Sequence, residues 1–162
     1  MKVLWFSLLF FTATFAAIVL AGQFGLLRGR APNDLGVRNS RLKPPSRSPN
    51  SVSSQADLYP DNPQREYAYI APFQFSGDAE QAMARLAEIL TSRERTVVAS
   101  QAPDYIYAQS TTKLLRFTDD IEFWLDRSAG LIHARSASRL GRKDFHVNRA
   151  RIETIRAQFA KN

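Results

Sequence analysis

Residues 114–155 read LLRFTDDIEFWLDRSAGLIHARSASRLGRKDFHVNRARIETI, and their pattern is the most informative part of the sequence for the fold. Two runs with alternating apolar residues flank the short polar turn Arg127–Gly130, and a basic loop and a helical pattern follow them. Alternation with a period of two is typical of strands, and strands joined by a short turn pair antiparallel. The stretch therefore predicts a β-hairpin that leads into a C-terminal helix.

The length of the turn predicts the register of this hairpin. A four-residue loop makes Asp126 and Leu131 the closing pair. The pairs that follow along the ladder are Trp124 with His133, Glu122 with Arg135, and Asp120 with Ala137. Glu122 and Arg135 thereby become direct cross-strand neighbours. We expect them to form a bidentate ion pair that the last helix half-covers.

Acidic and basic residues are separated along the same stretch. The acids are Asp119, Asp120 and Glu122. The bases are Arg135, Arg139, Arg142, Lys143, Arg149 and Arg151. Two of these arginines fall in the first turn of the expected helix, where the macrodipole favours anions and disfavours cations, so a carboxylate or a bound anion is needed beside them. The bases therefore form either an internal ion-pair network or an anion-binding site.

A metal site is a further interpretation of the acids. Asp120, Glu122 and His133 offer the ligands that zinc or a harder divalent cation uses, and such a site would make the protein a metal-dependent hydrolase. The surplus of arginines favours pairing of the carboxylates instead. We therefore expect no metal and no other cofactor, and we keep the hydrolase as the alternative function.

The patterns before this stretch predict the rest of the domain. Alternating apolar residues predict strands over 66–75, 96–99 and 105–108. A 3.6-residue apolar repeat predicts a helix that ends near Thr91, with Asp78 or Ser76 as its N-cap.

The last helix is expected to begin with Asn148 as its cap, with Val147 and Ile152 forming a hydrophobic staple. Consecutive strands joined by short turns pair antiparallel, and the helices must cover one face of the sheet. The sequence thus predicts a two-layer α+β domain in which two helices cover an antiparallel sheet of about five strands.

The N-terminus carries a segment of membrane type. Residues 3–22 contain no charged side chain and match the roughly 20 residues that a helix needs to cross the hydrocarbon core. Residues 19–21 (Val-Leu-Ala) also fit the small-residue pattern that a signal peptidase accepts. We favour an uncleaved transmembrane anchor over a cleaved signal peptide.

Two rules disagree about the side of the membrane on which the domain lies. Six bases follow the apolar segment before residue 48, and by the positive-inside rule they favour a cytoplasmic domain. A signal-type segment exports the domain instead, and we expect the domain outside the cytoplasm, in the cell envelope. Residues 23–47 are basic and rich in Pro and Ser, which indicates a linker, and residues 48–162 form the α+β domain. The stretch SPNSVSSQ, residues 48–55, is either part of the tether or an ordered arm on the domain.

Composition bounds the function. The 162 residues include no cysteine, which excludes disulfides, thiolate metal sites and a Cys nucleophile. The formal charge of +7 favours anionic partners such as lipid headgroups. No Gly-x-Ser-x-Gly elbow or P-loop is present, and nucleic-acid binding is not expected because few aromatics lie among the bases. We therefore expect a membrane-tethered or exported module that is not an enzyme.

Three motifs together resemble a known bacterial and plastid family. They are SPNSVSSQ at 48–55, RFTDDIEF at 116–123, and RSASRLGRKDFHVNRARIE at 135–153. They are similar to the PNCVSSQ, DDxEF and RSASRxGxxDxxxNRxRxE patterns of the domain of unknown function 1499 family. The resemblance implies that the arm at 48–55 belongs to the domain, and it implies no activity. Ser51 stands where the family usually has Cys, so any role of that thiol is absent here.

Overall fold

Strands β5 (Thr118–Asp126) and β6 (Leu131–Ser138) form the central hairpin of the computed structural model, which describes residues 2–161. Asp126 closes the hairpin with Leu131, as the four-residue loop predicts. The other predicted pairs are also present, namely Trp124 with His133, Glu122 with Arg135, and Asp120 with Ala137. The predicted register of the hairpin is therefore confirmed.

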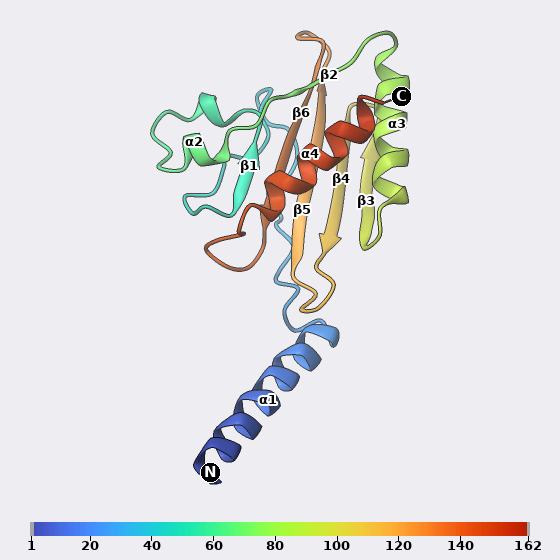
Figure 1. The fold of residues 1–162 in the computed structure, drawn as a ribbon. Coiled ribbons are helices and arrows are strands. Elements are labelled where there is room, and N and C mark those ends of the chain that lie inside the picture. The colour runs from blue at the N-terminus through green and yellow to red at the C-terminus, as the bar shows by residue number, and fades with distance from the viewer. Residues whose placement is uncertain (1, 162) are drawn as a thin grey trace.

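The remaining strands extend this hairpin into an open antiparallel sheet (Figure 1). On one side β4 (Tyr105–Thr111) pairs with β5, and β3 (Thr96–Ala102) pairs with β4. On the other side the short strands β1 (Ser51–Ser53) and β2 (Phe73–Gln74) both pair with β6. The order β1-β6-β5-β4-β3, with β2 beside β6, confirms the α+β class and an antiparallel sheet of the expected size.

The strand predicted over residues 66–75 is wrong except at its end. Residues Arg65–Ala68 form the short helix α2, and only Phe73–Gln74 are strand. Asn62 Oδ1 accepts a hydrogen bond of 2.8 Å from Gln64 N, and this local turn starts the helical backbone. A short 3-10 helix, η1 (Ala56–Leu58), precedes it.

Two helices cover one face of the sheet, as predicted (Figure 1). Helix α3 (Ala79–Ser92) and helix α4 (Val147–Phe159) bury their apolar stripes against the core. Inward-facing side chains of β5, such as Ile121 and Phe123, form the floor of that core. The Phe73 ring packs edge-on against Phe123 and Phe159, which joins β2, β5 and α4. Aromatic pairs of this geometry add to the hydrophobic gain of burial.

The two helix starts differ in how well the sequence predicts them. Asp78 caps α3 as expected, because its side chain accepts a 2.8 Å hydrogen bond from Gln81 N. The expected cap of α4 is wrong: Asn148 lies inside the helix and is fully buried. Asp144 takes the capping role instead, accepting hydrogen bonds of 3.1 Å from both His146 N and Asn148 N. The expected staple is also wrong, since Val147 is 42% exposed.

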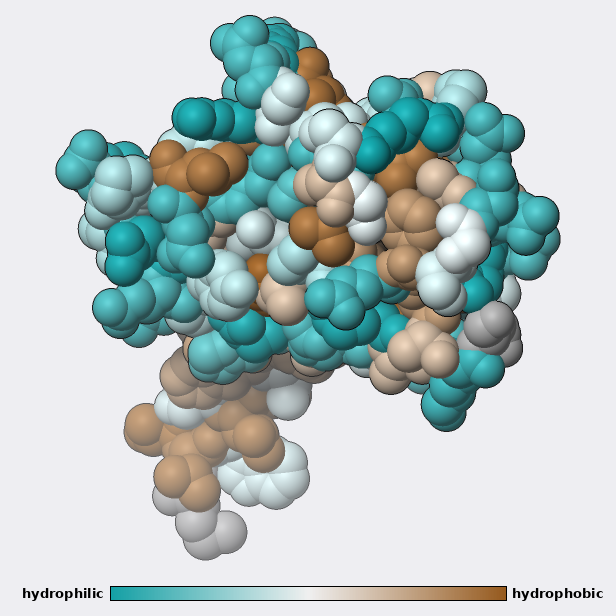
Figure 2. Space-filling view, turned by 90° about the horizontal axis from the view of Figure 1, so that it is seen from above, coloured by the Kyte–Doolittle hydropathy of each residue, from teal (hydrophilic) through white to brown (hydrophobic). Residues whose placement is uncertain are grey.

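Helix α1 (Lys2–Gln23) projects from the domain as a separate rod (Figure 1). Apolar side chains lie on all sides of it, and Gly22 is its one buried residue among those described. Figure 2 shows this apolar helix extending away from a largely hydrophilic domain surface. Among residues 2–161, α1 is the one helix that is long and apolar enough to cross a membrane, a test that a signal sequence also passes.

The chain after α1 packs on the face of the sheet that the two helices leave open. Gly36 N donates a 2.9 Å hydrogen bond to Glu122 Oε1 in the middle of β5. Leu42 is buried, and its backbone N–H donates to Gln55 Oε1 at 2.8 Å. Residues that the composition indicates as a linker are thus partly built into the domain.

Candidate functional site

The first ion pair of the charged stretch is the predicted one, Glu122 with Arg135. Cross-strand pairing brings Arg135 Nη1 to 3.0 Å from Glu122 Oε2, and both side chains are at most 5% exposed. The other carboxylate oxygen accepts hydrogen bonds from Gly36 N at 2.9 Å and Tyr105 OH at 2.8 Å. Burial and the neighbouring carboxylate raise the pKa of Tyr105, so the phenol remains a donor. The Glu122 carboxylate is therefore buried and hydrogen-bonded through both of its oxygens.

Two details of this prediction are wrong. The pair has a single N–O contact and is not bidentate. The last helix does not cover it, because Glu122 points to the face opposite the apolar residues Ile121 and Phe123, which α3 and α4 cover. The chain around Gly36 covers the pair instead. A segment without periodicity gives no sequence signal for such a contact.

The second pair joins Asp120 to Arg139 on the same face. Arg139 donates from Nε to Oδ2 at 2.9 Å and from Nη2 to Oδ1 at 2.7 Å, which is the bidentate geometry of a strong guanidinium–carboxylate pair. Tyr107 OH also donates to Asp120 Oδ1 at 2.6 Å. Hydrogen bonding to Asp120 raises the pKa of Arg139, and burial raises the pKa of Tyr107.

The third pair lies on the helix-covered face. Arg151, in the first part of α4, donates from Nη2 to Asp119 Oδ2 at 2.5 Å and from Nη1 to Asn148 Oδ1 at 2.8 Å. Asn148 Nδ2 in turn donates to Asn50 O, Ser138 Oγ and Asp144 Oδ2. The Asp119 carboxylate thus offsets the positive charge of Arg151 at the helix start. This is one of the two outcomes that the sequence left open. This network ties α4 to β5, β6 and the arm before β1.

The six candidate bases therefore divide into two groups. Arg135, Arg139 and Arg151 are neutralised in the three buried pairs. Arg149 donates from Nη2 to Tyr67 O at 2.5 Å, while Arg142 and Lys143 are exposed in the loop between β6 and α4. The structure does not bring all six together around one cavity, because their side chains lie on different faces of the sheet.

The three residues of the metal hypothesis have different partners in the structure. Asp120 and Glu122 are each engaged by an arginine and a tyrosine, and His133 stacks on Trp124 at a ring-centroid distance of 5.4 Å. Within residues 2–161 no group of three or more His, Asp or Glu side chains is arranged to hold a metal ion. In this arrangement each carboxylate is paired with an arginine and not placed to bind a metal ion.

His133 belongs to a small polar cluster that sequence reasoning missed. Ser54 Oγ accepts a 2.9 Å hydrogen bond from Ala134 N and lies 3.0 Å from His133 Nδ1, while His133 Nε2 is 4.0 Å from Asp126 Oδ2. The order Ser–His–Asp is that of a hydrolytic triad. Ser54 is only 8% exposed, however, and its hydroxyl joins β1 to β6. We assign the cluster a structural role. No local motif marks it, because β1–β6 pairing brings its members together.

This cluster makes stability depend on pH. Desolvation lowers the pKa of His133 below that of an unfolded histidine, about 6.5, with Asp126 opposing the shift. Between the two pKa values the unfolded chain binds more protons, so the free energy of unfolding falls as pH decreases below about 6.5, by at most about 1.4 kcal/mol per pH unit. Denaturant unfolding between pH 7 and 5 should show this slope.

The variant His133→Gln should flatten that slope, because glutamine can still accept from Ser54 without titrating. His146→Gln, which removes an exposed imidazole at the start of α4, is the matched control and should keep the wild-type slope. Equal slopes for wild type and His133→Gln would contradict the assignment.

A basic surface lies where α1 meets the domain. Antiparallel pairing places the start of β3, the β4–β5 loop and the end of β6 at one end of the sheet, which we call the proximal end. Gln23 Nε2 donates a 2.8 Å hydrogen bond to Leu114 O, and a Cβ at Gly22 would overlap the Leu115 backbone, so α1 docks closely on this end. The bases of the proximal end are Arg28, Arg30, Arg95, Lys113, Arg116, Arg142 and Lys143. Four of them, Arg95, Lys113, Arg142 and Lys143, lie in turns between elements that the sequence predicts. Only the order of the strands in the sheet shows that these turns meet at one end.

Comparison with known families identifies the domain. The family model described as "Protein of unknown function (DUF1499)" matches residues 41–159. The chain belongs to this family. Comparisons of the chain with curated proteins and with solved structures found no match.

The three motifs that resemble the DUF1499 family meet in one part of the structure. Asn50 in the first motif hydrogen-bonds through its backbone and side chain to Asn148 and Gly141 of the third. Asp119 of the second motif pairs with Arg151 of the third. The family-like residues thus build the buried network. Ser51 is also buried there, and its hydroxyl accepts a 2.8 Å hydrogen bond from Ser46 N, a role suited to the oxygen that stands in place of the usual sulfur.

Proposed function

We propose that this member of the DUF1499 family is a membrane-anchored, non-catalytic module whose domain rests with its proximal end on the lipid surface. One observation carries the proposal: an exposed, apolar helix leaves the domain at the end where bases outside the three buried ion pairs gather. At about 1.5 Å per residue, its 22 residues span about 33 Å, close to the roughly 30 Å hydrocarbon core of a bilayer. The proximal end then lies at the depth of the headgroups.

The charge distribution supports the same placement. The arginines of the buried pairs stabilise the fold, whereas Arg142 and Lys143 of the predicted anion site face solvent at the proximal end. Basic residues near an anionic bilayer each contribute about 1 kcal/mol of attraction. We therefore propose anionic lipid as the partner. A hydrolase that uses Asp120, Glu122 and His133 is less well supported, because arginines already neutralise both carboxylates.

The anchor is tested by alkaline carbonate extraction of membranes. The wild-type chain should stay in the pellet with its N-terminal residues intact by mass. Phe11→Arg places a charge near the middle of the span, at a cost of about 2.5–3.5 kcal/mol, and should shift protein to the supernatant. Phe24→Arg, at another exposed phenylalanine just beyond α1, is the matched control and should remain in the pellet.

Release of a wild-type chain shortened up to Ala21 would contradict the anchor and establish a cleaved signal instead.

The same membranes can show on which side of the bilayer the domain lies. Because the chain has no cysteine, Ala129→Cys in the exposed hairpin turn introduces a single thiol. We propose an extracytoplasmic domain, so an impermeant maleimide should label this thiol in intact cells. Labelling only after lysis would place the domain in the cytoplasm.

A further inference from the structure

A cavity of about 420 Å³ opens at the proximal end, beside the start of the domain. Three separate segments supply arginines to its wall: Arg28 from the chain after α1, Arg95 from the α3–β3 turn and Arg116 from the β4–β5 loop. Thr111 and Thr118 add hydroxyl groups. The size is in the range of small-ligand sites, and this lining matches a ligand with phosphate oxygens.

The arginines of this wall are not neutralised as those of the buried pairs are. Neither Arg28 nor Arg116 has an ion pair within residues 2–161. Arg95 contacts Glu94, but that carboxylate is 83% exposed, and such surface pairs are weak. Arg139 also reaches the cavity, with its charge already offset by Asp120. The wall therefore carries a net positive charge.

Arg116 gives the most specific signal. Its Nε is buried yet has no hydrogen-bond partner in the described part of the chain. The loop that holds it is ordered, since Thr112 N donates to Phe117 O at 2.9 Å and Phe117 N to Thr112 Oγ1 at 3.0 Å. A buried N–H without a partner is costly, so an acceptor from a ligand would satisfy it.

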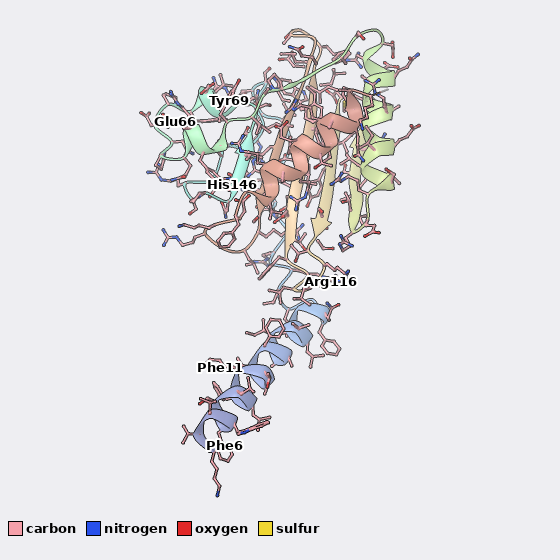
Figure 3. The ribbon with its side chains drawn as sticks, viewed as in Figure 1. Phe6, Phe11, Glu66, Tyr69, Arg116 and His146 are labelled. Atoms are coloured by element: carbon pink, nitrogen blue, oxygen red, sulfur yellow. The ribbon has the colours of Figure 1, made fainter. Side chains whose placement is uncertain are left out.

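The proposed anchor places this cavity at the depth of the lipid phosphates. Figure 3 places Arg116 directly beyond the C-terminal end of α1, and the loop of Arg116 is the one that Gly22 and Gln23 contact. Phe24 and Leu26, on the chain between α1 and Arg28, are 82% and 76% exposed, as expected for residues that enter the membrane interface.

We propose that this cavity binds a phosphate group, and that the phosphate is the headgroup of an anionic phospholipid from the bilayer that α1 crosses. Arg116 and Arg28 hold the phosphate oxygens, and the apolar residues beside them contact the acyl chains. The inference rests on the proposed membrane anchor and adds the lipid class to it. It also gives α1 a fixed lipid partner at its junction with the domain.

The test uses the full chain in a neutral detergent, with thermal unfolding as the readout. Short-chain phosphatidylglycerol should raise the Tm of wild type, and phosphatidylcholine should not. Arg116→Gln and Arg28→Gln should each weaken this stabilisation about ten- to a hundred-fold in lipid concentration, the factor expected from loss of one charged hydrogen bond. Arg142→Gln removes an exposed base of the same end that does not line the cavity, and should behave as wild type.

Three outcomes would overturn the proposal. The first is the same lipid-induced shift in wild type and both cavity variants, and the second is no shift in wild type. The third is a shift with inorganic phosphate as large as with the lipid, which would assign the cavity to a free anion. Because the assay needs no bilayer, its failure is distinguishable from failure of the anchor, which carbonate extraction reports independently.

Discussion

Replacing Glu122 by glutamine is expected to lower the free energy of unfolding by about 3–5 kcal/mol, the cost of leaving one member of a buried ion pair without its partner. The carbonyl of the new glutamine could still accept from Gly36 N and Tyr105 OH, which both bond to one carboxylate oxygen in wild type. Its amide group would then face Arg135 Nη1, so two donors would meet in a site where Arg135 is only 4% exposed. Chemical denaturation of the detergent-solubilised chain measures the loss.

Two controls isolate the buried charge in this experiment. Tyr105→Phe removes one hydrogen bond to the same carboxylate and leaves the ion pair, so it should cost about 1 kcal/mol. Glu153→Gln breaks the Arg156 pair on the surface of α4, where the carboxylate is 47% exposed, and should cost no more than about 1 kcal/mol. A Glu122→Gln loss as small as that of Glu153→Gln would contradict the buried-pair assignment.

The double variant tests whether the two charges act on each other. Arg135→Gln alone should also be strongly destabilising, since it leaves the Glu122 carboxylate buried without its cation. With both residues changed to glutamine, no buried charge is left unpaired, and the total loss should be smaller than the sum of the single losses. Additive losses would mean that the residues stabilise the fold through other neighbours.

The hairpin could be predicted from the sequence because the residues that specify its register are close together in the chain. The spacing of apolar residues fixes which side chains share a face, and a four-residue turn then fixes every pair from Asp126–Leu131 onwards. Glu122–Arg135 was predictable for this reason. Asp120–Arg139 and Asp119–Arg151 were not assigned as pairs, because the path of a loop and the docking angle of α4 decide them.

The errors have physical causes of the same kind. Asn148 and Asp144 are both residues that cap helices, and burial of Asn148 among polar partners decides that Asp144 takes the role. The chain around Gly36 has no periodicity, and its contact with Glu122 spans 86 residues, so no local pattern reveals what covers the ion pair. The cavity of the proximal end likewise needs three distant turns to meet, and only the finished sheet brings them together.

Asn148→Ala is the second change expected to have a large effect, about 3 kcal/mol or more of lost stability. The fully buried Asn148 side chain accepts from Ser136 Oγ and Arg151 Nη1, and its amide group donates to Asn50 O, Ser138 Oγ and Asp144 Oδ2. Alanine removes all of these bonds at once and leaves several buried polar groups without a partner, each worth about 1–3 kcal/mol. The cavity left by the missing amide adds to the loss.

The change should also act at a distance along the chain, because Asn148 is the point where α4 holds the arm at residues 48–55. Hydrogen exchange of the Ser138 amide, which donates to Asn50 O at 3.0 Å, should become faster in Asn148→Ala. Thr154→Ala is the matched control on the same helix: its hydroxyl bonds only the exposed helix backbone, so both stability and this exchange rate should stay near wild type. Unchanged protection of Ser138 in Asn148→Ala would show that strand pairing alone holds the arm, and that the network serves only the helix.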